Sequence, residues 1–424
     1  MCLGLERSAS ISHWLIRISL FINYFVFAIL LNSVGTVILQ VQNVYAVSES
    51  SAAVLEAFKD LPIAVTSFLV ASYIARIGYR RSMLIALGTI GAACLLMPHL
   101  PAFWTTKLLF TAIGVCFALV KVSAFATLGL VTANRKDHVS LMNFLESFFM
   151  VGVVAGYFIF SAFVDDSDPA SIAWLDVYYL LAAMVAVAFV LLSVAKLDES
   201  SVQARPDAST LRDFVEMMAL AARPLVLIFV ASAFLYVLIE QSIMTWLPTF
   251  NSRILNLSAS LSIQMASILA AATALGRFTA GIVLRRLDWF PVLAAGLLAA
   301  AALVLVALPL AGNASTEPVT AWRDAPVAAF VFPLIGFCIA PVYPAINSTI
   351  LSALPARQHA PMAGLIVVFS ALGGTSGSIV TGNMFEAFGG LTAFYFSLLP
   401  IGVVLICLYA FKRQTDAIAA APQL

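Results

Sequence analysis

Long apolar blocks are the feature that most limits what this chain can fold into. Each is about as long as the roughly 20-residue helix that crosses a bilayer core. Only 10% of the 424 residues carry a charge and 62% are hydrophobic, whereas a soluble domain carries about 25% charged residues. This excludes a soluble globular enzyme. Twelve blocks are found: 14–39, 50–76, 82–98, 103–131, 139–164, 173–195, 224–250, 258–284, 290–311, 326–353, 360–384 and 390–411.

The blocks are too long for the strands of a membrane barrel, and they lack sustained alternation of apolar and polar residues. The sequence therefore predicts an all-α membrane protein with twelve transmembrane helices. The net charge of +1 gives no basis for binding nucleic acid. The cysteines and histidines do not occur at metal-ligand spacing, so we expect neither a metal site nor a cofactor.

One long polar stretch divides the chain into two sets of six blocks. We predict an N-terminal half over residues 1–195, a cytoplasmic central loop over 196–223 and a C-terminal half over 224–424. Glycines four residues apart recur in the fifth and eleventh blocks, as Gly152/Gly156 and Gly373/Gly377. Such pairs let helices approach closely. The repetition favours two six-helix pseudo-repeats with a binding site between them.

The basic residues set the expected orientation. With the N-terminus in the cytoplasm, sixteen of the 22 Lys and Arg residues lie in cytoplasmic segments and only Arg253 and Arg323 in outer loops. The positive-inside rule therefore places both termini in the cytoplasm. The first block is longer than the core of a signal peptide, so we expect it to be a retained span. We expect a cell inner membrane location.

The segment after the second block carries a family resemblance. It reads Ala-Ser-Tyr-Ile-Ala-Arg-Ile-Gly-Tyr-Arg-Arg over residues 71–81 and resembles the G-x-x-x-D-R-x-G-R-R signature of the major facilitator superfamily. Arg76, Gly78, Arg80 and Arg81 carry the resemblance, with Tyr79 inserted before the two final arginines. Ala71 and Ala75 replace the glycine and the aspartate. The resemblance implies twelve helices in two halves and an inner latch that acts during switching. Arg277, near the inner end of the eighth span, is expected to act at the same gate.

A narrower resemblance is to the fucose-permease and TsgA-type branch. It rests on the run from Asn143 through Glu146 to Gly152, and on Phe234 to Glu240 followed by Trp246-Leu-Pro248. The branch implies proton-coupled uptake. However, the first span offers Asn23 and Asn32 in place of an acid, and Lys121 stands where the fourth span has an acid in that branch.

Charged residues within the spans are candidate functional groups, because an ionised side chain at a helix centre costs about 2.5–3.5 kcal/mol. Lys121 and Glu146 lie at similar depth in neighbouring spans, and we expect them to form an ion pair. This pair is either a fixed structural bridge or part of a cavity that binds solute. Asn143, one turn before Glu146, shares its face. A lysine in a cavity suits a carboxylate or phosphate.

The second span carries Glu56, Lys59 and Asp60. The two carboxylates are four residues apart and share a face, which favours uptake of a proton, and Lys59 can neutralise one of them. A solvated helix end with snorkelling side chains is the alternative interpretation.

Two further spans add polar candidates. The seventh places Tyr236 and Glu240 on one face with Gln241 beside them, and Pro248 is a candidate hinge nearer its end. In the tenth, Pro341 and Pro344 predict a kink that turns Asn347 towards the cavity, or else into a helix–helix hydrogen bond. The candidate residues for binding solute or protons are Asn32, Asp60, Lys121, Asn143, Glu146, Tyr236, Glu240, Gln241 and Asn347.

These features favour a secondary active transporter, not an enzyme, that moves a small polar or anionic solute by proton symport. Its expected partners are that solute, protons and the lipid bilayer, and we expect a monomer. One alternative is a proton-driven exporter of a drug, siderophore or metabolite. A second is a membrane sensor of the same fold that does not transport, although buried ionisable groups argue against it.

Overall fold

The computed structural model describes residues 2–132, 135–195, 197, 199, 215, 217, 219–312, 318–354 and 358–420. Of residues 2–13, 70–73, 75–76, 129, 135–139, 143, 353, 359–361 and 416–420 it describes the backbone alone. The described chain is almost entirely helical, as expected for a bilayer, where backbone groups must be satisfied within each span. The described chain also contains an isolated parallel β-bridge between Leu257 and Val319.

The residues of the predicted N-terminal half form seven α-helices and one short 3-10 helix. They are α1 (Cys2–Asn32), α2 (Val34–Tyr45), α3 (Glu49–Ile77), α4 (Tyr79–His99), α5 (Phe103–Val131), α6 (Arg135–Ser161), η1 (Ile172–Asp176) and α7 (Val177–Val194).

The residues that follow the central loop form the remaining helices. They are α9 (Pro224–Arg253), α10 (Ala259–Val283), α11 (Trp289–Ala311), η2 (Trp322–Asp324), α12 (Val327–Val331), η3 (Phe332–Leu334), α13 (Ile335–Ile339), α14 (Val342–Ala353), α15 (His359–Phe388), α16 (Gly390–Tyr395) and α17 (Leu398–Ala420).

The chain forms two compact units. The first contains residues 1–34, 61–165 and 170–210, and the second contains 35–60, 166–169 and 211–424. The second unit thus includes α2 and the first part of α3, which come from the predicted N-terminal half. The predicted division at 1–195, 196–223 and 224–424 stays a prediction, and most of its central loop lies outside the described residues.

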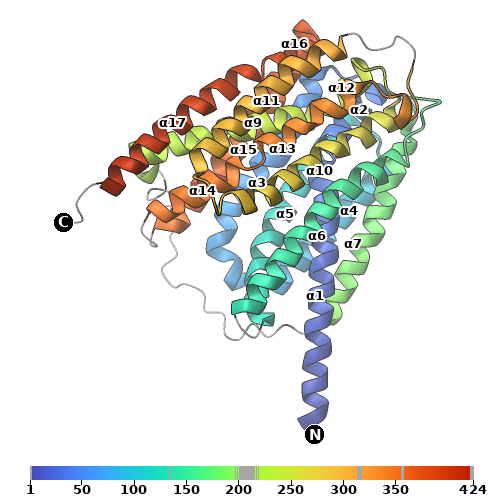
Figure 1. Cartoon of the computed structure of the whole chain (residues 1–424). Helices are drawn as coiled ribbons and strands as arrows, with labels where there is room; N and C mark the ends of the chain where they lie inside the picture. Colours follow the sequence, from blue (N-terminus) through green and yellow to red (C-terminus); the bar gives the residue numbers. More distant parts are fainter. Residues whose placement is uncertain are drawn as a thin grey trace. The chain divides into compact units, whose positions relative to one another are not determined.

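Close helix contacts form at the glycine pairs in both units. In the first unit, a Cβ added at Gly152 would lie 2.8 Å from the carbonyl oxygen of Phe25, so α6 packs directly on the backbone of α1. In the second, Gly373 and Gly377 bring α15 against the backbone of α9 at Phe234 and Leu238. Figure 1 shows α9 and α15 side by side. The predicted role of these glycines in helix packing is confirmed.

Several predicted spans are interrupted. The first block breaks at Ser33 into α1 and α2, and the twelfth forms α16 and α17. The tenth block forms α12, η3, α13 and α14, with a break at Pro341 that confirms the predicted kink. Pro248 produces no such break, because α9 continues through it to Arg253. The predicted hinge at Pro248 is therefore not formed in this structure.

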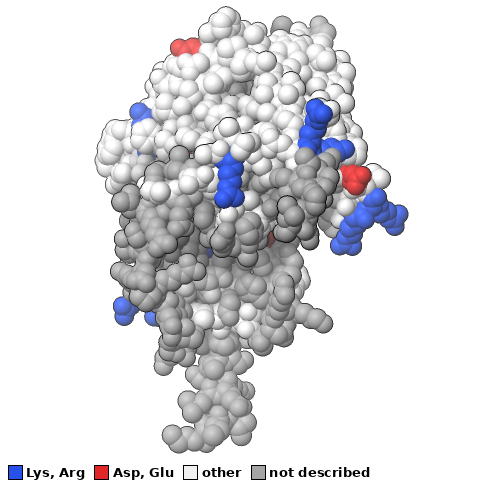
Figure 2. All heavy atoms as spheres, turned by 90° about the vertical axis from the view of Figure 1, so that its left-hand side faces the viewer, with Lys and Arg blue, Asp and Glu red and all other residues white. Residues whose placement is uncertain are grey.

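Eleven helical segments among the described residues are long and apolar enough to cross a membrane. The remaining predicted span, 50–76, corresponds to α3, whose 29 residues extend over about 43 Å at 1.5 Å per residue. Its first part carries three ionisable side chains within five positions. Figure 2 shows a face on which most of the described surface is uncharged. The protein is an all-α, multi-pass membrane protein.

Candidate functional site

Three ionisable side chains of α3 form the most buried charged group in the described chain. Glu49 in the first turn of α3 favours the start of this helix. Glu56, Lys59 and Asp60 follow in its next turns. Because residues three and four apart on a helix are neighbours, Glu56 lies beside both Lys59 and Asp60.

The ammonium group of Lys59 bridges the two carboxylates. Lys59 Nζ lies 2.5 Å from Glu56 Oε1 and 3.5 Å from Asp60 Oδ1. From α9, the amide of Gln241 donates a hydrogen bond to Glu56 Oε1 at 2.8 Å, and the hydroxyl of Thr245 donates to Glu56 Oε2 at 3.2 Å. We call Glu56, Lys59, Asp60, Gln241 and Thr245 the α3 cluster. All of it lies within the second unit.

The α3 cluster is closed to solvent. Glu56 is 0% exposed, Lys59 5% and Asp60 8%. The alternative interpretation of this segment, a solvated helix end with snorkelling side chains, is therefore wrong. Burying charges in this way is costly unless they are paired and hydrogen-bonded, and Glu56 meets that requirement with three donors.

Asp60 is bound less completely than Glu56. Among the described residues it forms an ion pair with Lys59 at 3.5 Å, which is longer than the 2.5 Å between Lys59 and Glu56. Its other oxygen, Oδ2, faces Gly374 of α15, where a Cβ would collide with it. The Gly-rich run 373–377, which the sequence explains by helix packing, thus also makes room for a carboxylate.

A second group of side chains lies on α9 and α10. It includes Glu240, the residue directly before Gln241 of the α3 cluster. The hydroxyl of Tyr236 donates a hydrogen bond to Glu240 Oε1 at 2.9 Å, and Arg277 Nη2 of α10 donates to the same oxygen at 3.1 Å. The Glu240 side chain is 19% exposed and that of Arg277 40%. The expected shared face of Tyr236 and Glu240 is found, and Arg277 forms an ion pair. We call these three residues the Glu240 cluster.

Aromatic and polar residues of α14 and α15 extend the Glu240 cluster. The ring of Tyr343 stacks on that of Tyr236, with 5.6 Å between centroids and an interplanar angle of 22°. Its hydroxyl lies 2.8 Å from that of Ser370. One turn after Tyr343, Asn347 is half-buried, and its Oδ1 atom is buried with no hydrogen-bond partner in the described chain.

Sequence reasoning missed four of these neighbours: Thr245, Tyr343, Gly374 and Ser370. Thr245 lies four residues after Gln241, so helical spacing alone places it on the same face. Tyr343 likewise lies four residues before Asn347. Gly374 and Ser370 belong to α15, which contacts α9 through tertiary packing, and no local signal identifies them.

The first unit holds Lys121 on α5 and Glu146 on α6, both exposed. Lys121 Nζ lies over two rings of its own helix, 5.6 Å from the centroid of Phe117 and 5.9 Å from that of Phe125. No ion pair joins Lys121 to Glu146 among the described side chains, which corrects the expected bridge. Similar depth did not suffice, because the ammonium lies against the aromatic face of its own helix.

Two further predicted residues of the first half have limited roles here. Asn32, at the end of α1, donates a hydrogen bond to the carbonyl of Ala28 at 2.8 Å, so it satisfies its own helix beside the break at Ser33. The side chain of Asn143 lies outside the described residues.

The signature segment is held by the end of α7 and by Glu199, which follows it. Gly78 has φ +92° at the start of α4, a conformation that favours glycine. The backbone N–H of Arg80 donates to Glu199 Oε1 at 2.7 Å, and the Arg80 Nε group donates to the carbonyl of Leu192 at 2.9 Å. Arg81 is exposed, and the side chain of Arg76 lies outside the described residues.

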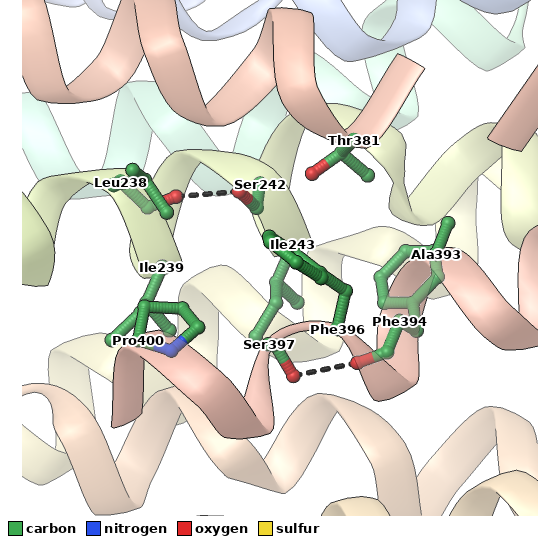
Figure 3. Close-up of a pocket in the computed structure, with 10 residues that line it drawn as sticks. All are labelled: Leu238, Ile239, Ser242, Ile243, Thr381, Ala393, Phe394, Phe396, Ser397 and Pro400. Atoms are coloured by element: carbon green, nitrogen blue, oxygen red, sulfur yellow. Dashed lines mark hydrogen bonds between the residues drawn. The ribbon is translucent and has the colours of Figure 1, made fainter. Parts of the chain in front are cut away.

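A small pocket lies where α9, α15, α16 and α17 meet (Figure 3). Its lining is mostly apolar, with Ser242, Thr381 and Ser397 as the hydroxyl groups. Ser242 donates to the carbonyl of Leu238, and Ser397 to that of Phe394, each at 2.6 Å. The hydroxyls of Ser242 and Ser397 are thus satisfied by nearby backbone carbonyls, and we do not assign the pocket a ligand. No group of three or more metal-ligating side chains occurs in the described part of the chain.

A family model described as Major Facilitator Superfamily matches residues 18–378 of the chain. No curated protein matches it in sequence.

Several solved transporters share its fold. A bacterial homologue of the human lysosomal transporter Spinster, in an inward-facing and occupied conformation, has a TM-score of 0.71 at 14% identity, with 95% of this chain and 96% of that chain covered. The nucleoside transporter NupG has a TM-score of 0.70 at 14% identity, covering 97% and 99%.

The major facilitator superfamily transporter FucP, in the outward conformation, has a TM-score of 0.59 at 16% identity, covering 94% and 99%. At such low identity, these likenesses establish the fold alone.

Proposed function

The chain belongs to the major facilitator superfamily, and from this premise we propose that it is a secondary active transporter that moves a small polar or anionic solute by proton symport. Family membership and the structural neighbours indicate a transporter and not an enzyme. Our proposal places it in a bacterial inner membrane, as a monomer, with both termini in the cytoplasm.

The α3 cluster is the observation that carries the proposal. Glu56 belongs to the predicted N-terminal half, whereas Gln241 and Thr245 belong to the predicted C-terminal half, and their hydrogen bonds join them inside the second unit. Alternating access requires such contacts to open and close. An ionisable group within the contact links protonation to that change.

Asp60 is the proton acceptor in our proposal. Glu56 accepts hydrogen bonds from Lys59, Gln241 and Thr245, which offset the cost of burying it. Asp60 shares the Lys59 ammonium at 3.5 Å and faces glycine backbone on its other side. Two buried carboxylates share one ammonium, so adding a proton to Asp60 leaves a neutral group that is less costly to bury.

The Glu240 cluster in the second unit is a proposed solute contact, and Lys121 in the first unit is proposed separately as another. Glu240 and Arg277 are partly exposed and present one charge of each sign beside two stacked tyrosines. Lys121 presents an exposed ammonium with no carboxylate partner in the described chain. These groups suit polar or anionic solutes better than large apolar ones.

The test is proton movement in proteoliposomes that contain a pH-sensitive dye. We would add sugars, sugar acids, amino acids and carboxylates one at a time outside the vesicles. Solute-dependent acidification of the lumen is expected, and Asp60→Asn is expected to abolish it. The control is Asp324→Asn, because Asp324 is an exposed carboxylate whose ion pair among the described residues is with its neighbour Arg323 at 3.5 Å.

The alternatives give different results in the same vesicles. An exporter would show no acidification with these solutes but would dissipate an imposed proton gradient when larger amphipathic compounds are added. A sensor would show neither response. Acidification that persists unchanged in Asp60→Asn would contradict the proposed role of the α3 cluster.

A further inference from the structure

Two charged residues of opposite sign lie in neighbouring helices of the first unit. Lys121 on α5 and Glu146 on α6 are both exposed, and neither forms an ion pair with a described side chain. An ionised group within a span normally has a charged partner or faces a functional cavity. Here a cation and an anion are present without pairing to each other.

The two residues lie at a similar distance along α5 and α6 from the connection between these helices. Lys121 is ten residues before the end of α5 at Val131, and Glu146 is eleven residues after the start of α6 at Arg135. At 1.5 Å per residue both lie about 15–17 Å from the connection that joins the two helices. A ligand with two charges can therefore contact both side chains in one plane.

An aromatic cluster connects the two charges. Lys121 stands over Phe117, whose ring centroid lies 6.2 Å from that of Phe149. Phe149 is three residues after Glu146 and so shares its face of α6. Tyr24 of α1 packs 6.1 Å from Phe149, and its buried hydroxyl has no hydrogen-bond partner in the described chain. Lys121 and Glu146 thus border the same aromatic cluster, formed by Phe117, Phe149 and Tyr24.

We propose that the solute is a zwitterion, with its carboxylate bound by Lys121 and its ammonium bound by Glu146. This inference rests on the transport function proposed above and narrows its substrate class. The aromatic cluster suits an uncharged side chain carried beside the two charged groups, as in an α-amino acid. The hydroxyl of Tyr24, which has no hydrogen-bond partner among the described residues, is a further hydrogen-bonding group in this aromatic cluster.

The test uses matched derivatives that remove one charge at a time. The purified full-length protein is melted in detergent with each common L-amino acid, with its N-acetyl form, which lacks the ammonium, and with its methyl ester, which lacks the carboxylate. At least one amino acid is expected to raise Tm. Both derivatives are expected to bind about 10- to 100-fold more weakly, as the loss of one charge-assisted hydrogen bond predicts.

Two variants assign the ends of the ligand. Lys121→Gln is expected to bind the methyl ester as well as the amino acid, and Glu146→Gln is expected to do the same for the N-acetyl form. Lys107→Gln is the matched control, because Lys107 also lies on α5 over an aromatic ring, 4.4 Å from the centroid of Phe103. It is expected to retain the preference of the unaltered protein.

Binding of an N-acetyl form as tightly as its parent amino acid would overturn the inference, as would failure of every amino acid to bind. Acidification of vesicles by a sugar, with loss in Asp60→Asn, would then leave the proposed function standing and reject the zwitterion alone. Absence of any coupled solute would reject both.

Discussion

The α3 cluster and the Glu240 cluster meet α9 at adjacent residues, Gln241 and Glu240, yet they differ in charge and exposure. In the α3 cluster two carboxylates share one ammonium, and the three ionisable side chains are at most 11% exposed. In the Glu240 cluster one carboxylate faces one guanidinium, and the side chains are 19% and 40% exposed.

This difference suggests separate tasks for two neighbouring faces of one helix. A closed cluster with excess carboxylate can change its net charge by taking up a proton. A balanced, partly open ion pair can exchange its partner for a solute without a large desolvation cost, because surface ion pairs contribute only about 0–1 kcal/mol. We therefore assign proton binding to the α3 cluster and solute contact to the Glu240 cluster.

The largest expected effect comes from removing the shared ammonium. Lys59→Met leaves Glu56 and Asp60 buried without the cation that bridges them, which is expected to lower the free energy of unfolding by about 3–5 kcal/mol. Arg277→Met removes the cation of the open cluster and is expected to cost no more than about 1 kcal/mol. Thermal melting in detergent measures both. Equal losses of stability would remove the distinction between the clusters.

Smaller losses of stability distinguish two neighbouring glycines of α15. Gly373 packs against a helix backbone, whereas Gly374 makes room for the Asp60 carboxylate. Gly373→Ala places a methyl group against the backbone of Phe234 and is expected to cost about 1–3 kcal/mol of stability. Gly374→Ala instead places its methyl group against the Asp60 carboxylate and 3.3 Å from Cγ of Gln241. Both of these are side chains that can move. It is expected to preserve Tm and to reduce the protons carried per solute, measured in dye-loaded vesicles. A lower Tm in Gly374→Ala than in Gly373→Ala would contradict this assignment.

The smallest effects concern single hydroxyl donors. Thr245→Val removes the donor to Glu56 Oε2 and is expected to cost about 1 kcal/mol. Tyr236→Phe removes the donor to Glu240, which keeps Arg277, and is expected to cost about 0.5 kcal/mol. Chemical denaturation of the purified variants tests the order. A larger loss in Tyr236→Phe would show that Glu240 is the more strongly desolvated carboxylate.

Much of the fold follows from the sequence, because bilayer thickness fixes helix length and few charged side chains are tolerated in lipid. The spans, the kink at Pro341 and the glycine contacts of α6 and α15 were all predictable in this way. Local spacing also joined Glu56, Lys59 and Asp60, and Tyr236 with Glu240.

Contacts between helices were harder to predict, because helix depth is readable from the sequence but rotation is not. Lys121 and Glu146 were predicted to form an ion pair, and that pair is not found among the described side chains. Gln241 was predicted to bind solute or protons, and its hydrogen bond to Glu56 depends on α3 packing against α9. Tyr343 and Ser370 reach the Glu240 cluster only through tertiary packing.

The most direct test of the central claim compares exchange with accumulation in Asp60→Asn. This substitution leaves Glu56 and Lys59 as a one-to-one pair at 2.5 Å, so the cluster is expected to stay folded while it loses its proton acceptor. For a solute found in the vesicle assay, the account predicts that exchange of labelled for unlabelled solute persists and that accumulation driven by a pH gradient is lost. Accumulation at the level of the unaltered protein would contradict it.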